Sequence, residues 1–205
     1  MRIIGGTARG RRLQTPLNNT VKYSAQPIRP TAERAREALF SIIGQEVKGA
    51  TVLDLFAGTG ALGLEALSRS AQQAVFVDNN LHALQLVGKN IQLCGFSDRA
   101  LVLKRDLSKG LYFLEKQLPE LRFSIIFIDP PYRKGLTATM LHEIEKANLL
   151  SPDVLVVVEE NALSEFEPNV TELMLVDQRS YGETGFWFYR RTRPENKFIE
   201  SEEII

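Results

Sequence analysis

The sequence predicts an α/β fold, a mainly parallel sheet flanked by helices. After about Lys48, strand-like and helix-like segments alternate along the chain, which is typical of parallel sheets with crossover helices. The last three of the predicted parallel strands are continuous apolar runs, as expected for strands that are covered on both faces. A glycine-rich segment at 58–63 joins the first strand to the first helix after it, a position where such sheets commonly bind ligands.

Each element follows from its local pattern. The N-terminal part contains a strand-and-turn piece and then an amphipathic helix that begins after Pro30, on which Arg34 and Arg36 are expected to be exposed. The predicted parallel strands are 51–56, 74–77, 101–103, 124–128 and 154–158. The helices between them are 61–70, 80–93 and 137–147. An antiparallel pair is predicted at 171–176 and 186–190.

The composition is that of a folded protein. With 205 residues, the chain is long enough for one domain with a sizeable core. Apolar residues make up 44% and charged residues 24%, which excludes disorder for most of the chain. Its apolar runs are too short to span a membrane, its first residues lack a secretion signal, and its one cysteine cannot form an intramolecular disulfide. We therefore expect a cytoplasmic protein with a basic extension (1–47), a main domain (48–192) and a frayed acidic tail (193–205).

Charge is distributed unevenly along the chain. The 25 basic and 25 acidic residues cancel overall, but residues 1–36 hold eight basic residues and one acid, a net charge of +7. Residues 140–177 hold nine acids and one base, a net charge of −8. Neutralisation of phosphates is local, so the basic segment predicts a nucleic-acid partner. The expected contacts are Arg9, Arg11, Arg12, Arg29, Arg34 and Arg36, together with Arg133.

The segment 58–63 reads G-x-G-x-x-G. Glycines at this spacing let backbone amides at a helix N-terminus approach a ligand closely. The spacing alone does not identify the ligand. Asp54 precedes the first glycine by four residues, and a carboxylate there is an unfavourable neighbour for a pyrophosphate. It suits a cofactor with positive charge, such as S-adenosylmethionine, which carries an ammonium and a sulfonium.

Acids also follow the next two predicted strands. Asp78 could accept hydrogen bonds from both hydroxyls of a ribose, and Asp106 from an adenine amino group. Ribose binding is shared by several nucleotide cofactors, so Asp78 does not discriminate between them. The full set of expected cofactor-binding residues is Asp54, Phe56, Ala57, Gly58, Thr59, Gly60, Asp78, Asn79, Asp106 and Leu107.

The tetrapeptide Asp129, Pro130, Pro131, Tyr132 follows the predicted strand 124–128. Two prolines fix backbone φ and lack N–H donors, so this turn is stiff and its carbonyls face away from the ladder. Asp129 and the Pro130 carbonyl could each accept an N–H from an exocyclic amine of a nucleobase, which would align the nitrogen lone pair with a methyl donor. Tyr132 could stack on an extruded base. All four are candidate catalytic residues for N-methylation.

Several segments together resemble one family. They are MRIIGGTARGRRL (1–13), RPTAERAREALF (29–40), LDLFAGTGALGLEALSR (53–69), FVD (76–78), FIDPPY (127–132) and YGETGFWFYR (181–190). In this combination they resemble the RsmD family of 16S ribosomal RNA guanine-N2 methyltransferases, over residues 1 to about 191.

The resemblance implies a class I S-adenosylmethionine-dependent methyltransferase fold, a Rossmann-like seven-stranded sheet whose last strand is antiparallel. It also implies that Asp54, Gly58, Gly60, Asp78 and Asp106 bind the cofactor, that 129–132 hold the guanine, and that ribosomal RNA or the small ribosomal subunit is the partner. Asp78 stands where the family usually has glutamate, and a shorter acid can still reach the ribose.

Three other functions are weighed against this one. An adenine-N6 methyltransferase acting on DNA or RNA could use the same Asp-Pro-Pro-Tyr turn. A nicotinamide oxidoreductase would explain the glycines and Asp78 but not Asp54 or the two prolines. A ribosome-assembly module without catalysis would not need the acids. Two histidines without a spaced ligand set predict no metal site, and a monomer is expected.

Overall fold

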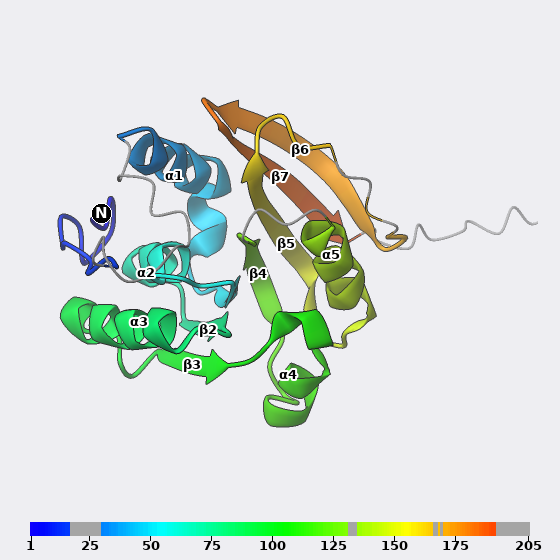
Figure 1. Cartoon of the computed structure of the whole chain (residues 1–205), viewed down its shortest axis with the longest axis horizontal. Coiled ribbons are helices and arrows are strands. Elements are labelled where there is room, and N and C mark those ends of the chain that lie inside the picture. Colours follow the sequence, from blue (N-terminus) through cyan, green and yellow to red (C-terminus); the bar gives the residue numbers. More distant parts are fainter. Residues whose placement is uncertain (17–29, 131–134, 166–167, 169, 192–205) are drawn as a thin grey trace, which may run out of the picture.

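The computed structural model describes residues 1–16, 30–130, 135–165, 168 and 170–191 (Figure 1). The acidic tail predicted at 193–205 lies outside these residues. The strands are β1 (Thr51–Leu55), β2 (Gln73–Asp78), β3 (Ala100–Lys104), β4 (Phe123–Ile128), β5 (Leu150–Asn161), β6 (Leu173–Tyr181) and β7 (Thr184–Arg191). The helices are α1 (Pro30–Ile43), α2 (Ala61–Ser68), α3 (Leu81–Cys94), α4 (Tyr112–Gln117) and α5 (Leu136–Lys146), with short 3₁₀ turns at Gly44–Val47 and Leu107–Lys109.

The seven described strands form one sheet in the order β3-β2-β1-β4-β5-β7-β6. Strands β1 to β5 run parallel, and β7 is antiparallel to both of its neighbours, β5 and β6. This order confirms the predicted class I methyltransferase fold. The chain reverses direction along the sheet between β1 and β4, and ligands of open α/β sheets bind beyond the carboxyl ends of the strands at such a point.

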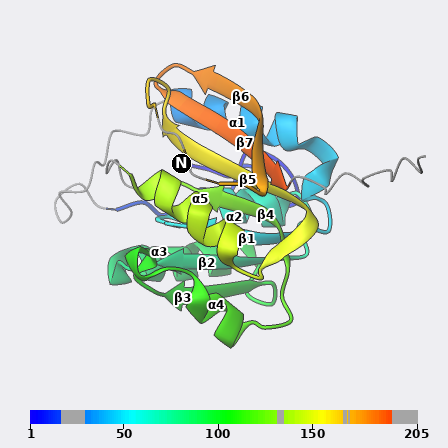
Figure 2. The same cartoon turned by 90° about the vertical axis from the view of Figure 1, so that its right-hand side faces the viewer.

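Helices cover both faces of the sheet. Helices α1, α2 and α3 lie on one face and α4 and α5 on the other (Figures 1 and 2). Consecutive strand residues alternate between the two apolar cores, as the pleat requires: in β1, Val52 joins the core beneath α1 to α3, and Leu53 joins the opposite core. None of the described helices is long and apolar enough to cross a membrane.

Two expectations about the elements were wrong. Strand β3 is not covered on both faces: it is an edge strand, and Leu101 is 40% exposed. Its apolar run is therefore only half buried, which a run of three residues could not reveal. Helix α4 was not predicted, because its six residues are too few for a clear helical period. The other predicted helices and strands all overlap their observed ranges, although β5 is longer at both ends and β6 extends beyond its predicted end to Tyr181.

Candidate active site at the carboxyl edge of the sheet

The glycine loop after β1 has an unusual backbone. Phe56, Gly58 and Gly60 all have positive φ, at 61°, 55° and 77°. Gly60 is the N-cap of α2, and its left-handed conformation directs the chain into the helix. The Ala57 amide donates to the Val77 carbonyl at the end of β2, 3.1 Å away. The loop therefore crosses from β1 over the end of β2, as a ligand-binding loop at this edge should.

Asp54 lies beneath the loop and is 2% exposed. Its Oδ2 accepts a hydrogen bond from the Gly63 amide, 2.9 Å away, in the first turn of α2. Burial raises the pKa of Asp54 to about 8, against the effect of the Gly63 hydrogen bond, and the acids Asp129 and Asp78 raise it further. The ionised form of such a buried carboxyl is stabilised when a cation binds beside it.

Gly63, the third glycine of the motif, lies where α2 packs closely on the sheet. A Cβ there would lie 2.4 Å from Cε1 of Phe76 and 3.0 Å from Oδ2 of Asp54. Phe76 is fully buried in β2 and has no room to move away. Only glycine allows both this packing and the hydrogen bond to Asp54.

We therefore expect Gly63→Ala to destabilise the protein by about 1–3 kcal/mol, the usual cost of overpacking a core. Gly88→Ala is the matched control, because Gly88 also lies within a helix and its Cβ would meet nothing within 4 Å. The control should be neutral or stabilising by up to about 1 kcal/mol. Urea unfolding of both variants measures the difference, and equal stabilities would contradict the close packing described here.

Asp78 ends β2, the strand beside β1, and Asp106 follows β3, the next strand along the sheet. Asp78 accepts hydrogen bonds from the amides of Gly58 (2.9 Å) and Asn80 (2.8 Å), so it fixes the glycine loop. Asp106 is exposed, and its Oδ1 accepts from the amide and hydroxyl of Ser108. These hydrogen bonds lower the pKa of Asp106. Both carboxylates keep lone pairs that could accept hydrogen bonds from a ligand.

The remaining predicted cofactor residues follow the same edge. Asn79 is exposed immediately after β2, and Leu107 is buried in the turn after Asp106. Thr59 lies in the loop, partly buried. The structure thus brings all ten predicted positions to the end of β1, the loop after it and the ends of β2 and β3.

Asp129 and Pro130 follow β4, next to the end of β1. The Asp129 amide lies 3.5 Å from the Leu55 carbonyl, so pairing with β1 continues to the edge of the sheet. The Asp129 side chain reaches the surface. Desolvation by the surrounding protein raises the pKa of its carboxyl, and the carboxylate of Glu160 raises it further. Pro131 and Tyr132, and likewise Arg133, lie outside the described residues.

Sequence reasoning missed two acids at the end of β5. Burial raises the pKa of Glu159, and the nearby Asp129 adds to that effect. Glu160 accepts a hydrogen bond from the hydroxyl of the buried Thr137, 2.7 Å away. The sequence pattern that could have identified them is the one used for Asp78 and Asp106. Acids that directly follow an apolar strand lie at this edge of the sheet. No group of three or more His, Cys, Asp or Glu among the described residues could hold a metal ion.

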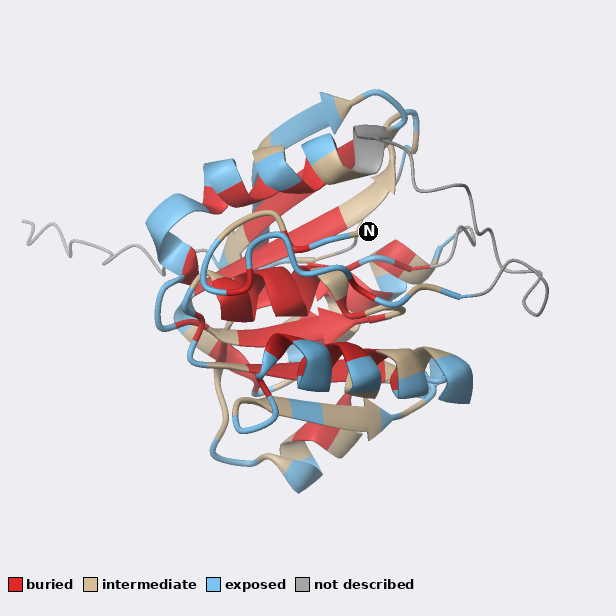
Figure 3. Cartoon of the chain, turned by 90° about the vertical axis from the view of Figure 1, so that its left-hand side faces the viewer, coloured by how far each residue is buried: buried red, intermediate tan, exposed pale blue. Residues whose placement is uncertain are grey.

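The N-terminal segment, residues 1–16, lies across α2 (Figure 3). With the sheet on the other side of the helix, every residue from Leu62 to Ser68 is buried. Ile3, Ala8 and Leu13 of the segment belong to the same apolar core as sheet residues such as Phe127. The predicted turn is present at residues 5–10, and the predicted strand is reduced to a single bridge between Arg2 and Arg12. The segment is therefore packed as part of the sheet's own core.

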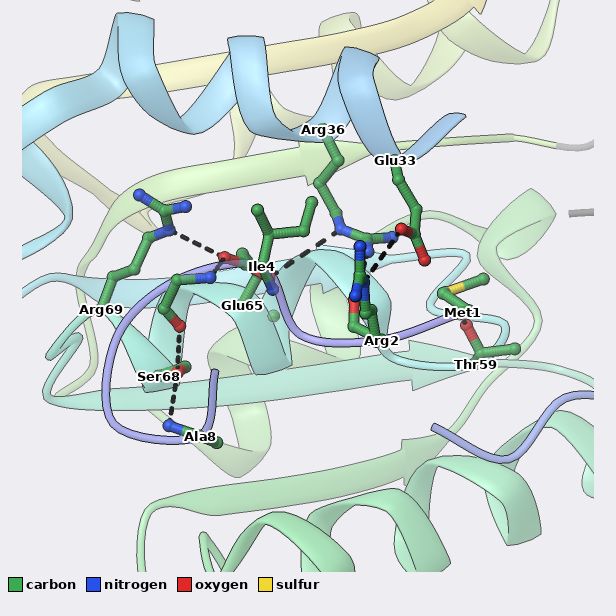
Figure 4. A network of polar contacts seen from close by, with 12 residues as sticks. Met1, Arg2, Ile4, Ala8, Glu33, Arg36, Thr59, Glu65, Ser68 and Arg69 are labelled. Carbon is green, nitrogen blue, oxygen red and sulfur yellow. Dashed lines mark hydrogen bonds and ion pairs between the residues drawn. The ribbon is translucent and has the colours of Figure 1, made fainter. Parts of the chain in front are cut away.

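Glu65 of α2 ties this segment down (Figure 4). Its fully buried carboxylate accepts hydrogen bonds from the amides of Ile4 and Gly5, both at 2.8 Å. Arg69 donates to the same carboxylate at 2.8 Å, and Arg36 lies 3.9 Å from it. An acid within an otherwise apolar helix was the sequence signal for this buried network, and it was missed.

The expectation that Arg36 is exposed was wrong. It is 7% exposed, and its guanidinium donates to the Arg2 carbonyl at 2.6 Å while facing Glu65. Burial lowers its pKa, and Glu65 opposes that effect. These contacts hold the guanidinium inside the protein, where it cannot reach a phosphate of bound RNA. Arg36 is therefore not one of the phosphate contacts, contrary to the prediction.

The other described arginines of this set are exposed but not gathered at one place. Arg9 lies beside the end of α2 at Ser68, since Thr7 and Ala8 bind Ser68. An eight-residue helix is about 12 Å long, so Arg9 is that far from the glycine loop. Arg11, Arg12 and Arg34 are also exposed, and Arg29 lies outside the described residues.

We expect Glu65→Ala to cost about 3–5 kcal/mol, because it leaves the buried Arg36 without its counter-charge. Glu46→Ala is the control: Glu46 pairs with Arg190 at 2.7 Å, but both side chains are largely exposed, so its loss should cost at most about 1 kcal/mol. Limited proteolysis should cut the first 13 residues faster in Glu65→Ala than in the control. Equal cleavage rates would mean that the carboxylate does not hold the segment.

Asn90 joins the N-terminal segment to the glycine loop. Its fully buried side chain accepts from the Gln14 amide (2.7 Å) and donates to the carbonyls of Gln14 (3.1 Å) and Thr59 (3.0 Å). Met1 also reaches the loop, with its sulfur 3.7 Å from the Thr59 hydroxyl. The positions of the loop and of the N-terminal segment are therefore set by shared contacts.

The fold and this edge together define a class I methyltransferase architecture. A family described as "Conserved hypothetical protein 95" matches residues 1–190. The "Putative rRNA methyltransferase YlbH" of Bacillus subtilis is 33% identical over 93% of this chain and 99% of its own length. The "Ribosomal RNA small subunit methyltransferase D" of Escherichia coli is 33% identical over 93% of this chain and 90% of its own length.

A solved structure agrees with these relatives. The "Putative methyltransferase yhhF from Escherichia coli" superposes with a TM-score of 0.77 at 30% identity, covering 94% of this chain and 98% of that one. The chain therefore belongs to this family, the RsmD family, and the resemblance noted in the sequence is confirmed.

Proposed function

We propose that this protein transfers a methyl group from S-adenosylmethionine to the exocyclic N2 of a guanine in 16S ribosomal RNA. One observation supports this above all: the carboxylates of Asp54, Asp78 and Asp129 surround one glycine loop at the ends of three neighbouring strands. The names of the relatives point to the same reaction class.

The site fits the cofactor by its chemistry. Asp54 places a carboxylate against the first turn of α2, where a dinucleotide would need to bring its pyrophosphate. This favours a cationic ligand over a nicotinamide cofactor. Asp54 would face the charged amino-acid end, Asp78 the ribose and Asp106 the adenine. When bound, the cofactor supplies an electrophilic methyl group on its sulfonium.

Asp129 and the Pro130 carbonyl would hold the target amine. Each can accept one N–H, which turns the nitrogen lone pair toward the methyl group. Alignment of this kind contributes up to about 7–11 kcal/mol to barrier lowering. Asp129 would take the proton that the amine loses during or after transfer, and its raised pKa suits that role. Pro131 would stiffen the turn, and Tyr132 would stack on the base.

Residues 1–47 would serve as an RNA-binding extension of the methyltransferase domain at 48–192. The phosphate contacts proposed are the exposed Arg9, Arg11, Arg12 and Arg34, together with Arg29 and Arg133. The protein would act as a monomer in the cytoplasm, on ribosomal RNA or on the small ribosomal subunit.

The test is incubation of the purified protein with labelled S-adenosylmethionine and small ribosomal subunits from cells that lack the endogenous enzyme. The RNA is then digested to nucleosides and analysed by mass spectrometry. N2-methylguanosine is the expected product. N6-methyladenosine would instead favour the adenine-N6 reaction, and absence of any labelled nucleoside on subunits, naked RNA and DNA would refute catalysis.

A further inference from the structure

An open groove lies beyond Asp106, between the end of β3 and α4. It has a volume of about 590 Å³. We call it the β3–α4 groove, and its walls include Lys104, Arg105, Lys109, Tyr112, Phe113 and Lys116. Asn79 and Asp106 of the proposed cofactor set also line it, so the groove adjoins the end of the site assigned to the adenine. The six residues named above belong neither to that set nor to the turn at Asp129.

The groove is basic in a protein whose overall charge is zero. Four cationic side chains line it, against one acid in the wall, Asp106, whose Oδ1 already accepts from Ser108. A second acid, Glu143, lies against the backbone of Gly110 at the rim. The excess of positive charge remains, and a phosphate chain is the ligand that such a groove attracts.

Aromatic side chains lie among these charges. Tyr112 is 74% exposed at the start of α4, so its side chain is accessible to a ligand. The guanidinium of Arg105 lies 5.3 Å from the centroid of the Phe113 ring. Its Nη1 also donates to the Lys104 carbonyl at 2.8 Å, which fixes its position. Rings and guanidinium planes between cations are the elements that bind single-stranded nucleic acid.

The groove lies at the same edge of the sheet as the target turn. Asp106 follows β3 and Asp129 follows β4. These two strands are three positions apart in the sheet, with β2 and β1 between them. Neighbouring strands are about 4.8 Å apart, so the two positions are separated by about 15 Å. A single RNA strand could therefore place one base at Asp129 and the next nucleotides in the groove.

We propose that the β3–α4 groove binds single-stranded RNA that flanks the modified nucleotide. Lys109 and Lys116 contact its phosphates, and Tyr112 stacks on one of its bases. The proposal rests on the proposed function, of which it names a second RNA contact surface. It is separate from the N-terminal segment with Arg9, Arg11 and Arg12, which lies across α2 on the face of the sheet opposite to α4.

The experiment measures binding of a short fluorescein-labelled single-stranded RNA to the full-length protein by anisotropy, over a range of salt concentrations. Lys109→Gln/Lys116→Gln should lower the slope of log affinity against log salt by about 1.4, since each phosphate contact on single strands contributes about 0.7. Tyr112→Ala should weaken binding roughly 5- to 100-fold. Tyr112→Phe keeps the ring and should bind like the wild type.

Controls separate this surface from general charge and from the cofactor site. Lys48→Gln/Lys146→Gln removes the same charge from exposed positions before β1 and at the end of α5, at the opposite edge of the sheet, and should leave the slope unchanged. Calorimetry should give the same affinity for S-adenosylhomocysteine in every variant. Thermal unfolding should show that each variant is folded.

The outcomes distinguish the groove from the enzyme activity. If groove variants bind and methylate RNA as the control does, the groove proposal fails while the proposed function stands. If the wild type methylates no RNA yet loses RNA affinity on Tyr112→Ala, the groove stands and the proposed function fails. If the groove variants bind small subunits more weakly but bind naked RNA as the wild type does, the groove contacts a ribosomal protein instead of RNA. That result would overturn the proposal.

Discussion

Asp129→Ala is expected to lower the rate of methyl transfer by about 10²- to 10⁴-fold while leaving affinity for S-adenosylhomocysteine within a few-fold of the wild type. The physical reason is that Asp129 accepts an N–H of the target amine and later its proton, and such roles contribute about that factor. Single-turnover transfer and calorimetric cofactor binding give the two readouts.

The same residue predicts a pH dependence. Only the carboxylate form of Asp129 can accept both the hydrogen bond and the proton, and the surrounding protein with Glu160 raises its pKa. The rate should therefore fall as the pH is lowered through that raised pKa, and Asp129→Asn should be slow at every pH. Asp98→Ala, which removes an exposed acid before β3, serves as the control. Loss of cofactor affinity together with transfer would show that Asp129 belongs to the cofactor site instead.

Asp54→Asn should weaken binding of S-adenosylhomocysteine about 10- to 100-fold and yet stabilise the free protein above pH 8. The loss of affinity corresponds to one hydrogen-bonded charge contact with the ligand's ammonium. The gain in stability has a separate cause, because the variant no longer has to bury an ionised carboxylate.

The direction of the pH effect on stability follows from the raised pKa. Asp54 has a pKa of about 8 when folded and about 3.9 when unfolded, so the folded state binds more protons between these values. The contribution of Asp54 to the free energy of unfolding should be most favourable below about pH 4. That contribution should be lost as the pH rises to about 8.

Thermal unfolding of wild type and Asp54→Asn from pH 5.5 to 9 measures this effect. The midpoints should diverge with rising pH in favour of the variant, by several degrees, whereas Asp98→Asn should follow the wild type. Parallel curves for wild type and Asp54→Asn would mean that the buried carboxyl is not the group that titrates.

The strongly patterned parts of the fold could be predicted from the sequence. Most of β4 and the centre of β5 are apolar runs, which is typical of strands in a sheet that is covered on both faces. The amphipathic faces of α3 and α5 predict those two helices. The exposure of β3 could not be predicted, because an edge position depends on which strands pair. That information lies in long-range contacts and not in three apolar residues.

The residues of the candidate site also differ in whether the sequence alone could predict their positions. Asp54, Asp78, Asp106 and Asp129 follow from the rule that carboxyl ends of parallel strands meet at one edge, and the structure brings all of them there. The burial of Arg36 could not be predicted from its neighbours in the sequence. Its partner Glu65 is 29 positions away, and the two residues belong to different helices. A charged residue facing inward on a helix is identified only when the opposing charge is known.

The side chain of Asn90 has a thermodynamic consequence. One amide group satisfies backbone atoms of Gln14 and of Thr59 at once, so neither the N-terminal segment nor the glycine loop can shift without disturbing a hydrogen bond of the other, each worth about 1 kcal/mol. A ligand that displaces one of them and moves Asn90 with it weakens the hydrogen bond of the other, and by reciprocity the effect runs in both directions. Cofactor and RNA, although they would contact different atoms, would therefore not bind as independent ligands.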